Sequence, residues 1–127
     1  MEKEKLDLLV VFAELRKVMD PYSRKLVVTI DSDYELSLDT HHIQPNKKPL
    51  FFGAVQVKKN YVSYHLMPVY VQPKLLEAIS PELRKRMQGK SCFNFTTVDP
   101  VLVEELAALT AVAYQSYQEQ GFVEGDK

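Results

Sequence analysis

The sequence contains a single cysteine, Cys92, and no apolar run that approaches the length of a membrane-spanning helix. One cysteine excludes an internal disulfide framework and any zinc site built from several cysteines. The first five residues are too charged for a secretion signal, so we expect a cytoplasmic protein without a membrane partner. The four glycines are isolated, and neither a Ser-His-Asp motif nor an HExxH motif is present. No constellation with credible spacing therefore indicates an enzyme.

What the chain has is enough apolar material for one globular domain over residues 1–127. Hydrophobic residues make up 46% of the 127 positions and charged residues 26%. Residues 31–46 carry four acidic and no basic groups, whereas residues 47–90 carry nine basic and two acidic groups. Separated blocks predict either acidic and basic patches or simply solvated faces. The net charge of −1 lacks the basicity expected of a nucleic-acid-binding protein.

The periodicity of apolar residues predicts an α+β domain. Two amphipathic helices are expected at the ends of the chain, with a mainly antiparallel sheet between them and a short helix pair inserted before the last strand. Both long helices are expected to pack on one face of the sheet, which gives two layers. The expected elements are a helix over 4–19, strands over 26–30 and 34–38, a loop over 41–49, strands over 50–57 and 61–69, helices within 73–88, a strand over 91–97 and a helix over 100–120.

Alternation along the strands divides their side chains into two sets, of which one is apolar. This set, the core face, is predicted to comprise Leu26, Val28, Ile30, Tyr34, Leu36, Leu38, Phe51, Val55, Val57, Val62, Tyr64, Leu66, Phe93 and Phe95. The other set, the second face, is small and polar, and is predicted to comprise Val27, Thr29, Asp31, Glu35, Ser37, Asp39, Phe52, Ala54, Gln56, Tyr61, Ser63, His65, Met67, Cys92, Asn94 and Thr96. A face of this kind is expected to be covered by a ligand, by a partner subunit or by the helices within 73–88.

A ligand site is predicted on the second face. Its expected members share strand parity and are Tyr61, Ser63, His65, Cys92 and Asn94. His65 could ionise the Cys92 thiol for nucleophilic chemistry, with Asn94 orienting the imidazole. A lone cysteine in a strand is more often a small packed residue, and we expect Cys92 to be inert.

Two charged groups are further candidates. Asp31, Glu35 and Asp39 would share a strand face and could supply oxygen ligands to iron or manganese, although a solvated acidic hairpin also accounts for them. A calcium EF-hand is excluded, because Leu36 stands where the loop needs glycine and His42 where it needs glutamate. In the basic region, Arg84, Arg86 and Lys90 could bind an anion.

Three segments carry a resemblance to a known family: Phe52 to Val55, His65-Leu66-Met67-Pro68-Val69-Tyr70, and Gly89-Lys90-Ser91-Cys92-Phe93-Asn94-Phe95. Over about residues 5–120 the chain resembles the YdhG-like bacterial domains of unknown function, one branch of which is described as frataxin-like intracellular iron chaperones. The resemblance implies an α+β fold with an antiparallel sheet, and it implies iron as a cofactor or cargo. It assigns no metal ligand to a numbered position of this chain.

Three functions are compatible with these observations. The first is a non-enzymatic cytoplasmic protein that holds a small ligand, a metal or a protein partner on the second face. The second, from the resemblance, is iron delivery through Asp31, Glu35 and Asp39. The third is a homodimeric protein-interaction module, in which strand edges or the second face form the contact. Whether the chain is a monomer or a homodimer does not follow from the sequence.

Overall fold

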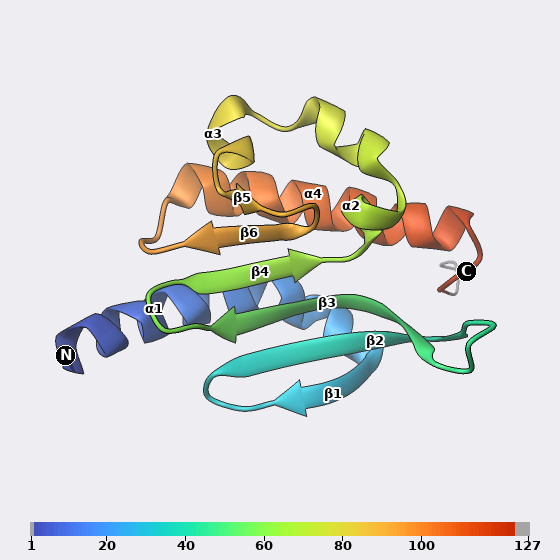
Figure 1. The fold of residues 1–127 in the computed structure, drawn as a ribbon, viewed down its shortest axis with the longest axis horizontal. Helices are drawn as coiled ribbons and strands as arrows, with labels where there is room; N and C mark the ends of the chain where they lie inside the picture. The colour runs from blue at the N-terminus through green and yellow to red at the C-terminus, as the bar shows by residue number, and fades with distance from the viewer. Residues whose placement is uncertain (1, 124–127) are drawn as a thin grey trace.

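The computed structural model describes residues 2–123, with side chains from residue 6 onward. Six strands form one antiparallel sheet in the order β1-β2-β3-β4-β6-β5, as Figure 1 shows. The predicted α+β class is therefore confirmed. The elements are α1 (Glu2–Met19), the 3-10 helix η1 (Asp20–Arg24), β1 (Val27–Asp31), β2 (Glu35–Ile43), β3 (Pro49–Val57), β4 (Val62–Leu66), α2 (Pro68–Val71), the 3-10 helix η2 (Pro73–Ala78), α3 (Pro81–Arg84), β5 (Met87–Gln88), β6 (Cys92–Phe95) and α4 (Pro100–Glu119).

The two long helices lie on the same side of the sheet, behind it in the view of Figure 1. Helix α1 contacts β3, β4 and α4, and the apolar residues of both helices join one buried cluster with the strands. Pro100 begins α4 because its missing N–H would have no partner in the first turn, and the Asp99 carboxylate accepts hydrogen bonds from the N–H groups of Val101 and Leu102. The predicted core face is thus covered by the predicted helices.

Two β-bulges change which face some residues occupy. In β1 the register shifts between Val28 and Ile30, so that Ile30 pairs with Ser37 on the second face and is 42% exposed. The assignment of Ile30 to the core was therefore wrong. Val28 and Tyr34 are exposed as well, although both were expected in the core, because β1 is an edge strand and Tyr34 lies in the turn after it.

The second bulge exchanges two phenylalanines. The pairing shifts from Leu38 opposite Gly53 to Asp39 opposite Phe51, and Phe52 is the extra residue between them. Phe52 is fully buried and its ring contacts Tyr114 and Tyr117 of α4, so Phe52 belongs to the core and Phe51 to the second face. The sequence assignment of these two residues was the reverse and is wrong.

Strand limits also differ from the expectation. Strand β2 continues to Ile43, through residues expected in a loop, and Thr40 there is buried and donates a hydrogen bond to the Leu50 carbonyl. Strand β4 ends at Leu66, because the chain turns into α2 at Pro68. These changes lengthen the β2–β3 hairpin and shorten β4.

The short helices within 68–84 do not cover the second face. Each of α2, η2 and α3 contacts α4, and Figure 1 shows them beyond the β5 edge of the sheet. A hydrogen bond from the Ser80 hydroxyl to the Glu105 carboxylate of α4 anchors the segment, and the Ser80 N–H also donates to Glu105. No other helix or strand of residues 2–123 lies over the second face in that view.

Candidate functional site

Strands β4 and β6 bring four of the predicted ligand residues together. Their register places His65 opposite Cys92 and Ser63 opposite Asn94, and residues opposite one another share a face. The expectation that His65 and Cys92 lie on the same face is confirmed. Tyr61 precedes β4 in the hairpin loop, outside the paired residues, and its carbonyl accepts a hydrogen bond from the Lys58 N–H.

Small side chains lie beside this group, along a line that crosses the sheet. Ile30, Ser37, Ala54, His65 and Cys92 are successive partners on five adjacent strands. Ser37 and Ala54 are buried although no helix lies over them, because larger neighbours on the same face shield such short side chains. Three strand spacings of about 4.8 Å each separate Ile30 from His65, a distance of about 14 Å.

The bulge in β3 adds two residues that the predicted site lacked. The Phe51 ring meets the His65 ring edge to face, with the ring centroids 4.9 Å apart. Asp39 is the cross-strand partner of Phe51 and therefore lies on the same face. Alternation alone gives the wrong side for Phe51; only Gly53, a strand glycine typical of a bulge, signals the change. We call Asp39, Phe51, Ser63, His65, Cys92 and Asn94 the second-face site.

The second-face site contains polar groups without partners. His65 Nε2 and Asn94 Oδ1 are buried and have no hydrogen-bond partner among the residues that the structure describes. Burial lowers the pKa of His65, because desolvation disfavours the imidazolium ion. Burial raises the pKa of the Asp39 carboxyl, and no neighbouring charge opposes this shift. An unpaired buried polar group costs about 1–3 kcal/mol, so this arrangement lowers the stability of the fold.

Cys92 is a half-buried free thiol opposite His65. No hydrogen bond joins the two side chains, so the His65 imidazole is not placed to ionise the thiol in this structure. Nucleophilic activation of cysteine requires a nearby cation or a hydrogen-bonded base.

The three carboxylates expected to bind metal do not form one site. Asp31 follows the β1 bulge, pairs with Leu36 of the core face and makes an ion pair of 2.8 Å with Arg16 of α1. Glu35 and Asp39 lie on the opposite face, where Glu35 accepts a hydrogen bond of 2.7 Å from Gln56. The shared face expected for Asp31, Glu35 and Asp39 was therefore wrong. Across residues 2–123, no group of three His, Cys, Asp or Glu side chains is placed to hold a metal ion.

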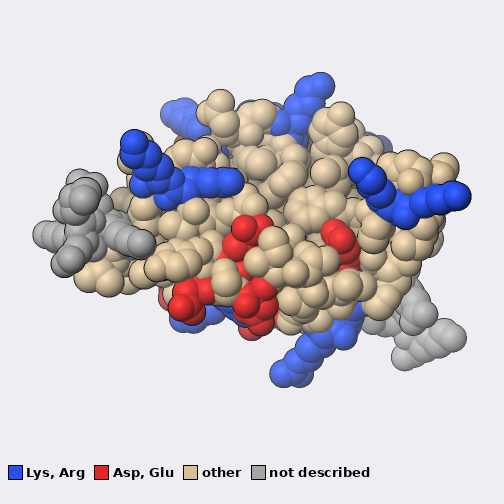
Figure 2. Space-filling view, turned by 60° about the horizontal axis from the view of Figure 1, so that its bottom comes forward, with Lys and Arg blue, Asp and Glu red and all other residues tan. Residues whose placement is uncertain are grey.

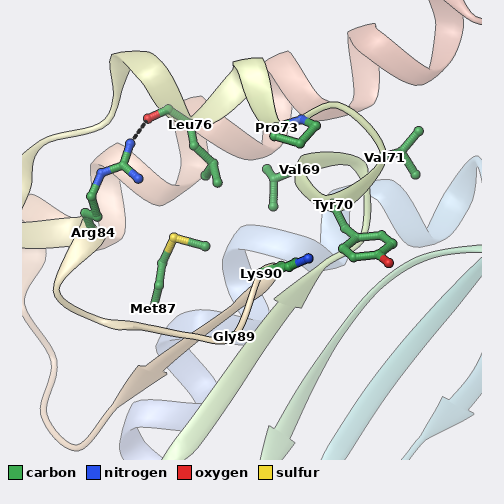
Figure 3. Close-up of a pocket in the computed structure, with 9 residues that line it drawn as sticks. All are labelled: Val69, Tyr70, Val71, Pro73, Leu76, Arg84, Met87, Gly89 and Lys90. Atoms are coloured by element: carbon green, nitrogen blue, oxygen red, sulfur yellow. Dashed lines mark hydrogen bonds between the residues drawn. The ribbon is translucent and has the colours of Figure 1, made fainter.

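The three residues of the predicted anion site, Arg84, Arg86 and Lys90, do not lie together either. Arg84 and Lys90 line a cavity of about 700 Å³ between the short helices and the β5–β6 turn, as Figure 3 shows. Arg86 does not line this cavity, because its guanidinium lies over the Phe95 ring, 5.8 Å from the centroid. Grouping Arg86 with the other two residues was therefore wrong. This cavity lies at the edge of the sheet and contains none of the second-face site.

Comparison with known proteins gives no match to a family model, to a curated protein or to a solved structure. The resemblance to the YdhG-like domains remains an expectation. The helices described between residues 2 and 123 include none with the length and apolarity to cross a membrane.

Proposed function

We propose that this chain is a cytoplasmic, non-enzymatic binding protein whose second-face site holds a small planar ligand that donates N–H hydrogen bonds. The observation that carries the proposal is two buried polar atoms without partners, His65 Nε2 and Asn94 Oδ1, with the Asp39 carboxylate on the same face. In a neutral imidazole one nitrogen is an acceptor, and the lowered pKa of His65 favours that neutral form. Asn94 lies three strands from Asp39 and several residues further along the sheet, so one small ligand would engage two of these groups, the Asp39 carboxylate and His65 Nε2.

The charge around the site favours a ligand that is also cationic. Figure 2 shows acidic side chains gathered over the β1–β2 side of the sheet. Asp39 supplies a carboxylate at the site, and its raised pKa reflects burial without a compensating cation. The Phe51 ring beside it provides the aromatic face on which a planar cation is stabilised. An amidinium or guanidinium group attached to a ring combines these features.

The two buried acceptors lie under neighbouring side chains, so a ligand must reach them by a local rearrangement. Rotation about the terminal side-chain bond of His65 or Asn94 is sufficient, because such torsions have broad and shallow preferences. The small side chains of Ser37 and Ala54 leave the ring of the ligand room to lie flat against the sheet.

Three isosteric probes test the proposal: benzamidine is cationic, benzamide neutral and benzoate anionic. Titration of the labelled protein followed by ¹H–¹⁵N NMR should shift the signals of residues 63–65 and 92–94. We expect benzamidine to bind about fivefold more tightly than benzamide, since a partly exposed ion pair contributes up to about 1 kcal/mol. Benzoate should bind least.

Two variants test whether the preference among these probes depends on Asp39 and His65. Asp39→Asn should remove the preference for benzamidine over benzamide, and His65→Phe should weaken both probes. Asp33→Asn is the matched control, because Asp33 is an exposed acidic residue of the β1–β2 turn outside the site. Equal binding of benzoate and benzamidine, or an undiminished preference in Asp39→Asn, would contradict the proposal.

A further inference from the structure

The cavity at the sheet edge combines an apolar wall with cations on two sides. Its lining includes Val69, Leu76 and Met87, which separate Arg84 from Lys90. Figure 3 shows Leu76 and Met87 projecting toward the space between the two cationic side chains. A volume of about 700 Å³ lies within the range of sites that hold small molecules, which is roughly 300–1,000 Å³.

Neither cation has a carboxylate partner among the side chains of residues 6–123. The ion pairs described there involve other residues, and none of those carboxylates lies within ion-pair distance of Arg84 or Lys90. The Arg84 guanidinium donates one hydrogen bond to the Leu76 carbonyl, which holds it against η2 and leaves its other N–H groups available. The Lys90 ammonium lies 6.0 Å from the centroid of the Tyr70 ring. Both charges are therefore held at the cavity without a counter-ion.

We propose that this cavity binds a small amphiphilic monocarboxylate, with the carboxylate on the Arg84 guanidinium and the alkyl chain against Leu76 and Met87, toward Lys90. Apolar walls alone would accept a neutral chain, and the two cations select the anion. The planar guanidinium fork of Arg84 matches a carboxylate, and the Lys90 ammonium on the far side of the apolar residues adds a longer-range attraction. The site is separate from the second-face site and takes the opposite charge of ligand.

Decanoate below its micelle concentration is the probe, with decanol as the uncharged chain and acetate as the anion without a chain. Isothermal titration calorimetry is suitable, because the chain has no tryptophan to report binding by fluorescence. Decanoate should bind about tenfold more tightly than decanol, since hydrogen bonds to charged groups contribute about 1.5 kcal/mol or more. Acetate should give no measurable binding.

Exposed cations of the same segment supply the variants and their control. Arg84→Gln should weaken decanoate binding about fivefold and Lys90→Gln about twofold, neither changing decanol binding, so that the two losses together account for the tenfold preference. Lys85→Gln removes a neighbouring charge that does not line the cavity, and it should leave decanoate binding unchanged. His65→Phe should also have no effect, which separates this proposal from the one for the second face.

Three results would overturn the inference. Equal affinity for decanoate and decanol would show an apolar cavity without anion selection. A loss in Lys85→Gln as large as in Arg84→Gln would show a general effect of positive charge. Sedimentation with phosphatidylglycerol vesicles without decanoate binding would assign these cations to a membrane surface instead.

Discussion

Gly53 stands where the strand that carries Phe51 comes closest to its neighbours, and Gly53→Ala tests that packing. A Cβ added at Gly53 would lie 2.6 Å from Met19 Cε and 2.7 Å from the backbone oxygen of His65. The methionine end is flexible and can move aside. The His65 oxygen belongs to the backbone of β4, so it can yield only if the β3–β4 pairing is distorted.

The expected loss of stability follows from this contact. Inserting a methyl group into a packed interior costs about 1–3 kcal/mol. For a domain of this size, about 2 kcal/mol corresponds to a decrease in Tm of roughly 6–10 °C. Because the displaced oxygen is that of His65, Gly53→Ala should also weaken benzamidine binding at the second face. Thermal unfolding followed by circular dichroism measures the first effect, and the NMR titration measures the second.

Met19→Ala provides the partner for a double-mutant cycle. In the Met19→Ala background the contact with Cε is absent, whereas the contact with the His65 oxygen remains. Gly53→Ala should therefore destabilise that background as well, but less than it destabilises the native sequence. A Gly53→Ala protein that melts at the native temperature would refute the close approach of β3 and β4 at this point.

Two further outcomes are expected. Burial lowers the pKa of His65, so between this lowered pKa and the ordinary value of 6.5 the unfolded chain binds more protons than the folded chain. Stability should therefore fall as the pH decreases through that window. His65→Phe should remove this contribution in urea unfolding measured from about pH 8 to about pH 5. The Tyr64 hydroxyl lies 2.7 Å from Thr110 Oγ1, which itself donates to the Leu106 carbonyl. Tyr64→Phe leaves the buried Thr110 Oγ1 without its donor and should cost about 1 kcal/mol in urea unfolding. An unchanged midpoint would contradict the hydrogen bond between Tyr64 and Thr110.

Local patterns in the sequence are sufficient where strands and helices are regular. The apolar stripes of α1 and α4 predict both helices and the face they cover, and β4 and β6 contain no bulge. Strand alternation therefore places Ser63, His65, Cys92 and Asn94 on one face correctly. These four residues are the part of the candidate site that the sequence predicts.

Bulges are where the same reasoning fails. One extra residue reverses every side chain beyond it, and the sequence contains no strong signal for the insertions that redirect Ile30 and Phe51. Asp39 and Asp31 are separated for the same reason, since the β1 bulge turns Asp31 toward Arg16. The cavity beside Arg84 depends on how the segment 68–90 packs on α4, and contacts so distant in sequence leave no local pattern.

The pKa of the Asp39 carboxyl, measured by ¹³C NMR with and without benzamidine, tests the proposed second-face site most directly. In the free protein it should be raised above the ordinary aspartate value, because the carboxyl is partly buried without a cation. Saturating benzamidine should lower it, whereas benzamide should leave it nearly unchanged. A pKa of Asp39 that does not respond to benzamidine would contradict the account.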